Sequence, residues 1–140
     1  MKRFIYLISP KKIYKNFYHD LNKVLASKKV EFFQLRIKKK NKKKIFQIAK
    51  KIGNITKKYN VKLIINDNPK IAQKVKADGC HLGQLDINIV QAKKILKNKI
   101  IGITCHNSKK LAQMALKNKA SYVAFGSFYK SKLKPDAKKS

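Results

Sequence analysis

Short apolar runs alternate along the chain with longer segments in which apolar residues recur every three or four positions. Apolar runs of roughly four to eight residues between turn residues are typical of buried strands, and the wider spacing is typical of amphipathic helices. Six strands are predicted in this way, at residues 4–8, 31–36, 62–66, 79–83, 100–104 and 122–126. Strands that alternate with helices indicate a parallel α/β fold, either a closed barrel or an open doubly wound sheet.

The clearest predicted helix follows the second strand. Its apolar side consists of Ile45, Ile48, Ala49, Ile52 and Ile55. Two other helix starts are marked by capping residues. Asn68 stands before Pro69, which suits the first helical position, and Asn107 and Ser108 precede another segment with helical spacing.

Two of the six acidic residues stand immediately behind or close behind predicted strands. Asp67 ends the run at 62–66, and Asp86 follows the run at 79–83. Parallel strands joined by crossover helices have their carboxyl ends on the same side of a sheet. Both carboxylates are therefore expected to point into one mouth of the fold.

The segment FFQLRIK, residues 32–38, alternates between apolar and polar side chains. Its polar residues Gln34, Arg36 and Lys38 share one face because side chains alternate along a strand. A strand buried on both faces normally reads apolar throughout. The polar face therefore predicts a ligand in the barrel interior or at its mouth, an anion such as phosphate, to which Asn66 adds a polar group. An exposed edge strand with solvated charges is the alternative.

The chain carries 36 Lys and Arg against 6 Asp and Glu, a net charge of +30. Such a balance ordinarily suggests nucleic acid or an anionic membrane as a partner. Here Arg3 and Arg36 are the only arginines, and the lysines are spread over every predicted helix. Bidentate phosphate and guanine contacts favour arginine, so the composition argues against a nucleic-acid role. The lysine run at 38–44 is instead expected to steer an anionic substrate.

The sequence predicts a cytoplasmic protein without a membrane segment. The first residues, MKRFIYLISPKK, contain an apolar run of only about five residues, which is too short for a secretory signal or a membrane span. Cys80 and Cys105 stand inside predicted strands, where we expect buried, reduced thiols.

Five segments carry a resemblance to a known family: FFQLRIK, LIINDN, ADGCHLGQLD, IIGITCHN and YVAFGSFYKSKLKPDA. In this order and spacing they resemble thiamine phosphate synthase and its relative, the thiazole tautomerase, which are TIM (β/α)8 barrels. The resemblance implies a transferase of thiamine biosynthesis. It would join hydroxymethylpyrimidine diphosphate to thiazole phosphate, giving thiamine phosphate and pyrophosphate with the help of Mg²⁺.

The resemblance also implies roles for individual residues and no catalytic side chain. Asp67 and Asp86 would hold the metal ion, which prefers carboxylates together with substrate phosphates. Ser131 matches a residue of the thiazole phosphate loop. The other implied substrate contacts are those of the pyrimidine diphosphate and its neighbours: Gln34, Arg36, Lys38, Asn66, Thr104 and Lys134.

The length of the chain limits how much of a barrel it can form, because a complete TIM barrel usually needs about 200 to 250 residues. The 140 residues are expected to form a single domain, an incomplete TIM barrel with about six of its strands. We expect such a chain to be marginally stable, prone to self-association and unable to join the two substrates. Two alternatives stay open: a diverged tautomerase-like protein with His106 as acid or base, and a non-catalytic basic binding protein.

Overall fold

Six parallel strands lie side by side, in chain order, in the computed structural model of the protein, which describes residues 3–38 and 41–129. Each strand pairs with the next one along the chain. The strands are β1 (Ile5–Ile8), β2 (Val30–Leu35), β3 (Lys62–Asn66), β4 (Gly79–Leu82), β5 (Ile100–His106) and β6 (Tyr122–Phe125). All six predicted strands are thereby confirmed, with ends that agree to within two residues.

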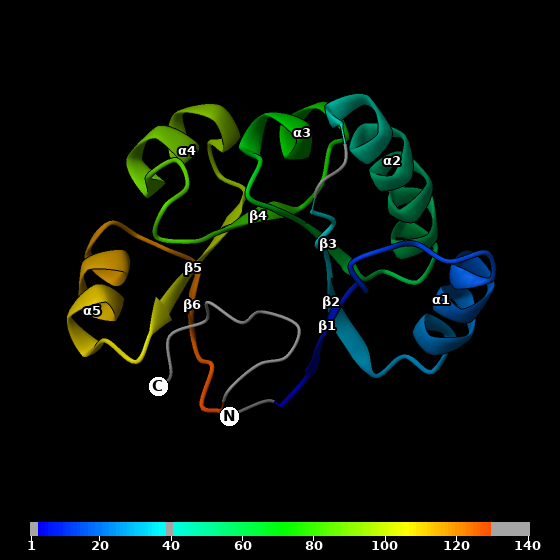
Figure 1. Cartoon of the computed structure of the whole chain (residues 1–140), viewed down its shortest axis with the longest axis horizontal. Helices are drawn as coiled ribbons and strands as arrows, with labels where there is room; N and C mark the ends of the chain where they lie inside the picture. The colour runs from blue at the N-terminus through cyan, green and yellow to red at the C-terminus, as the bar shows by residue number, and fades with distance from the viewer. Residues whose placement is uncertain (1–2, 39–40, 130–140) are drawn as a thin grey trace.

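The helices of the described residues form an arc outside the curved sheet, all on its convex side (Figure 1). They are α1 (Phe17–Ala26), α2 (Lys42–Lys58), α3 (Pro69–Lys74), α4 (Ile89–Leu96) and α5 (Lys109–Lys117). A doubly wound sheet has helices on both faces and a reversal in its strand order. That alternative is wrong for the described sheet, and none of the described helices lies on its concave face.

Four of these helices begin at a residue whose side chain accepts a hydrogen bond from the backbone N–H three positions on. Such caps satisfy N–H groups that have no partner within the helix. The four capping residues are Asn41, Asn68, Asn88 and Ser108. The predicted caps Asn68 and Ser108 are confirmed, while Asn107 precedes the cap and does not form it.

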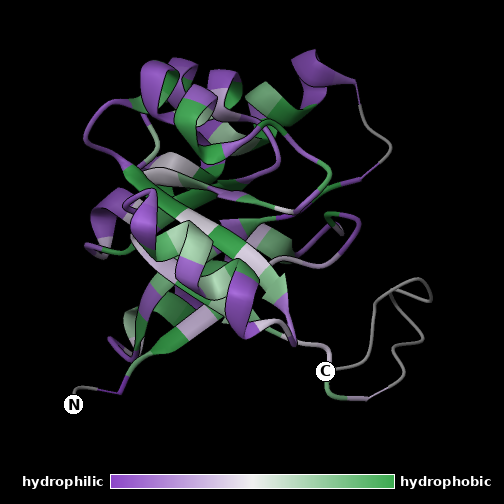
Figure 2. Cartoon of the chain, turned by 90° about the vertical axis from the view of Figure 1, so that its left-hand side faces the viewer, coloured by the Kyte–Doolittle hydropathy of each residue, from purple (hydrophilic) through white to green (hydrophobic). Residues whose placement is uncertain are grey.

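The two faces of the sheet differ in chemistry. Phe33 and Leu35 of β2 are almost fully buried in the apolar core beneath the helices, as are both cysteines. Gln34, between them in sequence, is buried on the opposite, concave side. The strands are drawn mainly in apolar colours in Figure 2, and the outer turns of the helices mainly in hydrophilic ones. The alternation predicted for β2 is confirmed.

A polar link fixes the position of β4 between its neighbours. The Asp78 carboxylate accepts a hydrogen bond from the Leu63 N–H at 2.7 Å, and the Asp78 carbonyl accepts one from the Ile100 N–H at 3.0 Å. A Cβ on the next residue, Gly79, would lie 2.2 Å from the Ile100 carbonyl oxygen. Only glycine allows this close approach of the two strands. The register of β4 is therefore fixed here, and with it the position of the loop that follows β4.

Strand β2 ends before Arg36, one residue earlier than predicted. The Arg36 N–H donates to the hydroxyl of buried Ser9 at 2.9 Å, so it leaves the strand ladder. Strand β5 continues two residues beyond the prediction, through a register irregularity between Thr104 and His106.

No helix of the described residues is long and apolar enough to cross a membrane.

Candidate active site

Asp67 lies immediately beyond β3, in a backbone conformation that few residues adopt. Its φ is 64°, in the left-handed region that Asp and Asn tolerate better than most residues with a Cβ. Its N–H donates to the carbonyl of His81 in β4 at 2.8 Å, which ties it to the neighbouring strand. The turn thereby directs the carboxylate across the end of the sheet.

Asp86 lies in the loop that follows β4, and it closes a tight turn. Its Oδ2 accepts a hydrogen bond from the Gly83 N–H at 2.7 Å, and its own N–H donates to the Gly83 carbonyl at 3.3 Å. A Cβ on Gly83 would lie only 3.1 Å from Asp86 Oδ2, which leaves little room for a larger residue. The loop therefore holds this carboxylate in one place.

The two carboxyl groups are in contact at the carboxyl ends of β3 and β4. Burial raises the pKa of Asp67 to about 6, and a hydrogen bond with Asp86 and the negative charge of that residue add to the rise. The charges of Lys38 and Arg36 act in the opposite direction and so place these two cations nearby. The structure thus brings together four of the predicted site residues from three strand ends.

Two half-buried carboxylates that repel each other are a suitable donor set for a hard divalent cation, which would relieve the repulsion. The described residues contain no cluster of three or more His, Cys, Asp or Glu side chains that could hold a metal alone. A cation at Asp67 and Asp86 would therefore complete its coordination with water and with a bound anion. Mg²⁺ usually binds in this manner, on one or two carboxylates and substrate phosphates.

A network of polar side chains covers the concave face of the sheet below this mouth. Gln34 Nε2 donates to the Tyr6 hydroxyl at 2.9 Å, and the Tyr6 and Tyr122 hydroxyl oxygens are 2.6 Å apart. The imidazole of His81 contacts the Tyr122 hydroxyl through Nδ1 at 2.9 Å and the Thr104 hydroxyl through Nε2 at 2.8 Å. The network joins five strands, and it reaches from the first strand of the sheet to the last.

Gln34 and Thr104, predicted as substrate contacts, are members of this network, and Asn66 lies at the end of β3, paired in register with His81. Their contact with a substrate stays a prediction. Ser131 and Lys134, predicted for the phosphate loop and the diphosphate, lie outside the described residues.

Sequence reasoning missed three members of this network, Tyr6, His81 and Tyr122. A signal for His81 was present: Cys80 and Leu82 are core residues, so the residue between them has to face the concave side. Nothing comparable pointed to the contact of Tyr6 with Tyr122, because these residues are 116 positions apart.

Gly102 of β5 makes room for Tyr122. A Cβ at Gly102 would lie 1.9 Å from Cζ of the Tyr122 ring, so the ring lies directly over this glycine. Burial raises the pKa of the Tyr122 phenol, and the proximity of Tyr6 adds to the rise. The tyrosine is therefore an un-ionised hydrogen-bonding group, held between Tyr6 and His81.

The strand order and the position of the described helices define a singly wound parallel α/β protein, with paired carboxylates and two cations at one mouth of the sheet. A family model described as thiamine monophosphate synthase matches residues 5–140. The chain belongs to this family.

Relatives and a solved structure agree with this assignment. The thiamine-phosphate synthase of Pelagibacter ubique is 57% identical over 134 residues, which are 95% of this chain and 65% of the relative. That of Saccharophagus degradans is 47% identical over 109 residues, 77% of this chain and 50% of the relative. The structure of a thiamine phosphate pyrophosphorylase from Pyrococcus furiosus superposes with a TM-score of 0.81 at 28% identity, covering 90% of this chain and 61% of that one. The chain spans less than two thirds of the length of each.

The position of Gly102 leads to a testable prediction. Gly102→Ala should displace the Tyr122 ring, break its contacts with Tyr6 and His81, and lower the free energy of unfolding by about 1–3 kcal/mol. Gly53→Ala is the matched control. Its new Cβ, inside α2, would meet only Leu63 Cδ2, at an ordinary 3.5 Å, so it should raise stability by about 0.5–1 kcal/mol. Urea unfolding of both variants measures the difference, and equal stabilities would contradict the packing described for Tyr122.

Proposed function

We propose that this protein is a cytoplasmic transferase of thiamine biosynthesis that joins hydroxymethylpyrimidine diphosphate to thiazole phosphate, giving thiamine phosphate and pyrophosphate. One observation carries the proposal: Asp67 and Asp86 are in contact at the mouth of the sheet, with Arg36 and Lys38 beside them. Membership in the thiamine monophosphate synthase family, with relatives named thiamine-phosphate synthase, supports the same reaction.

The diphosphate would bind at the mouth between the acids and the bases. Arg36 is half-buried, and the fork geometry of its guanidinium suits two phosphate oxygens at once. Lys38 is exposed at the rim and would act as a point charge on the outer phosphate. Mg²⁺, held by Asp67 and Asp86, would supply charge neutralisation for the diphosphate and the departing pyrophosphate.

The pyrimidine ring would lie against the network on the concave face. Hydroxyl, amide and imidazole groups of Tyr6, Gln34, His81 and Thr104 offer the donors and acceptors that ring nitrogens and an amino group require. These contacts would orient the methylene carbon that loses the diphosphate toward the thiazole nitrogen. Such a reaction depends on positioning and electrostatic stabilisation, and the nitrogen lone pair attacks without removal of a proton.

The remaining predicted contacts belong to the same proposal. Asn66 would hold the pyrimidine side of the substrate from the end of β3, while Lys134 would reach the diphosphate and Ser131 the thiazole phosphate.

We also propose that the curved sheet is part of a closed TIM barrel, with further parallel strands between β6 and β1. In the described residues β1 pairs only with β2, and β6 only with β5. Phe4 and Ile8 beside one free edge, and Phe125 at the other, are about half exposed. The relatives are longer than the matched segment, which supports the presence of additional strands in the family.

Barrel closure can be tested with a chimaera that joins the chain to the portion of the Pelagibacter relative that it does not match. Closure should protect the outward backbone N–H groups of β1 and β6 from hydrogen exchange, because each edge would gain a strand partner. It should also raise the midpoint of thermal unfolding. Fast exchange at both edges of a folded chimaera would contradict a closed barrel.

Binding of the diphosphate substrate can be measured on the chain itself. Arg36→Gln should weaken binding of hydroxymethylpyrimidine diphosphate in the presence of Mg²⁺ about tenfold or more, because a half-buried bidentate contact is lost. Lys42→Gln removes one positive charge from the exposed first turn of α2 and should weaken binding about twofold at most. Isothermal titration gives both affinities. Equal losses would mean that general charge, and not a defined site, attracts the diphosphate.

If Asp67 binds the metal ion, replacing it should maintain or raise the stability of the protein and weaken ion binding. Asp67→Asn fits the left-handed backbone and removes one of two repelling charges, so the variant should be at least as stable as the wild type when a chelator is present. It should also lose most of the effect of Mg²⁺ on substrate binding. Asp20→Asn makes the same charge change on α1, where Asp20 accepts a bond from the Tyr14 hydroxyl, and should keep that effect. Thermal unfolding and titration with and without Mg²⁺ provide the two readouts, and full Mg²⁺ dependence in Asp67→Asn would refute the assignment.

A further inference from the structure

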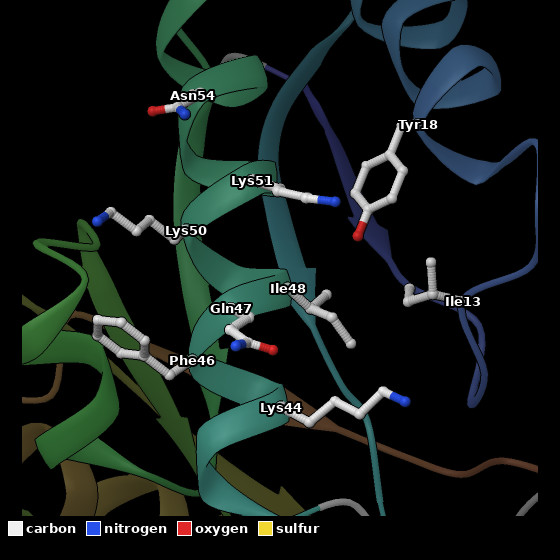
Figure 3. A pocket seen from close by; sticks show the side chains of 9 residues that line it. All are labelled: Ile13, Tyr18, Lys44, Phe46, Gln47, Ile48, Lys50, Lys51 and Asn54. Carbon is white, nitrogen blue, oxygen red and sulfur yellow. The ribbon is translucent and has the colours of Figure 1, made fainter.

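A hollow lies on the outside of the fold, between the start of α1 and the exposed side of α2 (Figure 3). Its volume is about 730 Å³. The described residues that line it are Ile13, Tyr18, Lys44, Phe46, Gln47, Ile48, Lys50, Lys51 and Asn54. We refer to it as the α1–α2 groove. The sheet lies between this groove and Gln34 with its hydrogen-bonding partners, which are on the concave side.

The side chains of the groove divide into two sets. Ile13 and Tyr18 lie on one side of it and face Lys44, Ile48 and Lys51 of α2, as Figure 3 shows. Phe46, Lys50 and Asn54 point to the other flank of the same helix. The part of the hollow that faces α1 is therefore lined by two ammonium groups, two aliphatic side chains and one phenol.

The position of one ammonium group is fixed by an aromatic ring. Lys51 Nζ lies 5.5 Å from the centroid of the Tyr18 ring, within the range of a cation–π contact. Lys44 stands two turns earlier on the same helix, at the other end of the hollow. No acidic residue is among those that line the groove, so nothing in its lining neutralises these cations. An anionic ligand would therefore meet no carboxylate in this lining that repels it.

Volume and lining together define the ligand class. Pockets of roughly 300–1,000 Å³ with apolar walls and a few polar groups are typical small-molecule sites. Ile13 and Ile48 supply the apolar walls, and the ammonium groups of Lys44 and Lys51 supply the polar ones. We propose that the α1–α2 groove binds a small organic anion with an apolar body, such as an aryl phosphate, independently of the active-site mouth.

Phenyl phosphate is a suitable probe, since it carries both features, while inorganic phosphate carries the charge alone and phenol the ring alone. Titration of the isotope-labelled chain with phenyl phosphate should give saturable NMR shifts of the Ile13 and Ile48 methyl groups and of the Tyr18 ring. Each partial probe should bind about tenfold more weakly, because it makes only one of the two kinds of contact. Equal binding of inorganic phosphate would overturn the proposal in favour of general charge attraction.

The chain offers a matched pair of variants for the same titration. Lys51→Gln should weaken phenyl phosphate binding about fivefold, because it removes the fixed cation of the groove. Lys58→Gln removes the same charge from the same helix and also ends a lysine–tyrosine contact, that of Lys58 Nζ with the Tyr59 ring at 5.2 Å, but this residue does not line the groove. It should bind as the wild type does. Equal losses in the two variants would refute the proposal.

A variant of the mouth separates this site from the proposed active site. Arg36→Gln should leave the shifts of Ile13, Ile48 and Tyr18 unchanged, whether or not it weakens binding of the pyrimidine diphosphate. Loss of these shifts in Arg36→Gln, or shifts confined to the residues of the mouth, would show that the probe binds there and that the groove is empty of ligand.

Discussion

Parallel pairing of the strands in chain order is the constraint on which both the core and the site depend. It places the described helices on one side of the sheet and the carboxyl ends of the strands at one edge. At that edge the carboxylates that follow β3 and β4 meet the cations that follow β2, although these residues are far apart in the sequence. Asp78 and Gly79 fix β4 at the opposite edge, through bonds to both neighbouring strands. A slip of β4 by one residue would turn His81 into the core and move the loop that holds Asp86.

The contact between the two acids is a cost that the apolar core has to offset. Burial and a neighbouring carboxyl group both disfavour the ionised form of Asp67, as its raised pKa shows. The left-handed backbone at Asp67 adds strain that only a few residue types relieve. An unfavourable charge and an unusual backbone conformation at one residue, beside two cations, are typical of a binding site and do not stabilise the fold.

The fold and the mouth could be predicted because they depend on local periodicity and on one general rule of topology. Period-two alternation identified the two faces of β2, and parallel connection brought Asp67 and Asp86 to one edge. The network on the concave face could not be predicted in the same way. It depends on the curvature of the whole sheet, which brings Tyr6 and Tyr122 within 2.6 Å, and on the missing side chain of Gly102. The end of β2 was missed because a side chain, Ser9, takes the N–H of Arg36 from the ladder.

The large positive charge contributes to ligand selection only where individual cations are held in place. A net charge of +30 attracts any anion, and salt screens this attraction over about 10 Å, so it cannot select a ligand. Selection requires a cation whose position is fixed by a second contact, together with a neighbouring group that fits the rest of the ligand. Arg36 meets this condition through its backbone bond to Ser9 and its place beside Asp67. Lys51 meets it through the ring of Tyr18 and the aliphatic walls of the α1–α2 groove. Lys42, exposed in the first turn of α2, is not among the residues that line the groove and serves as part of a solvated, steering background.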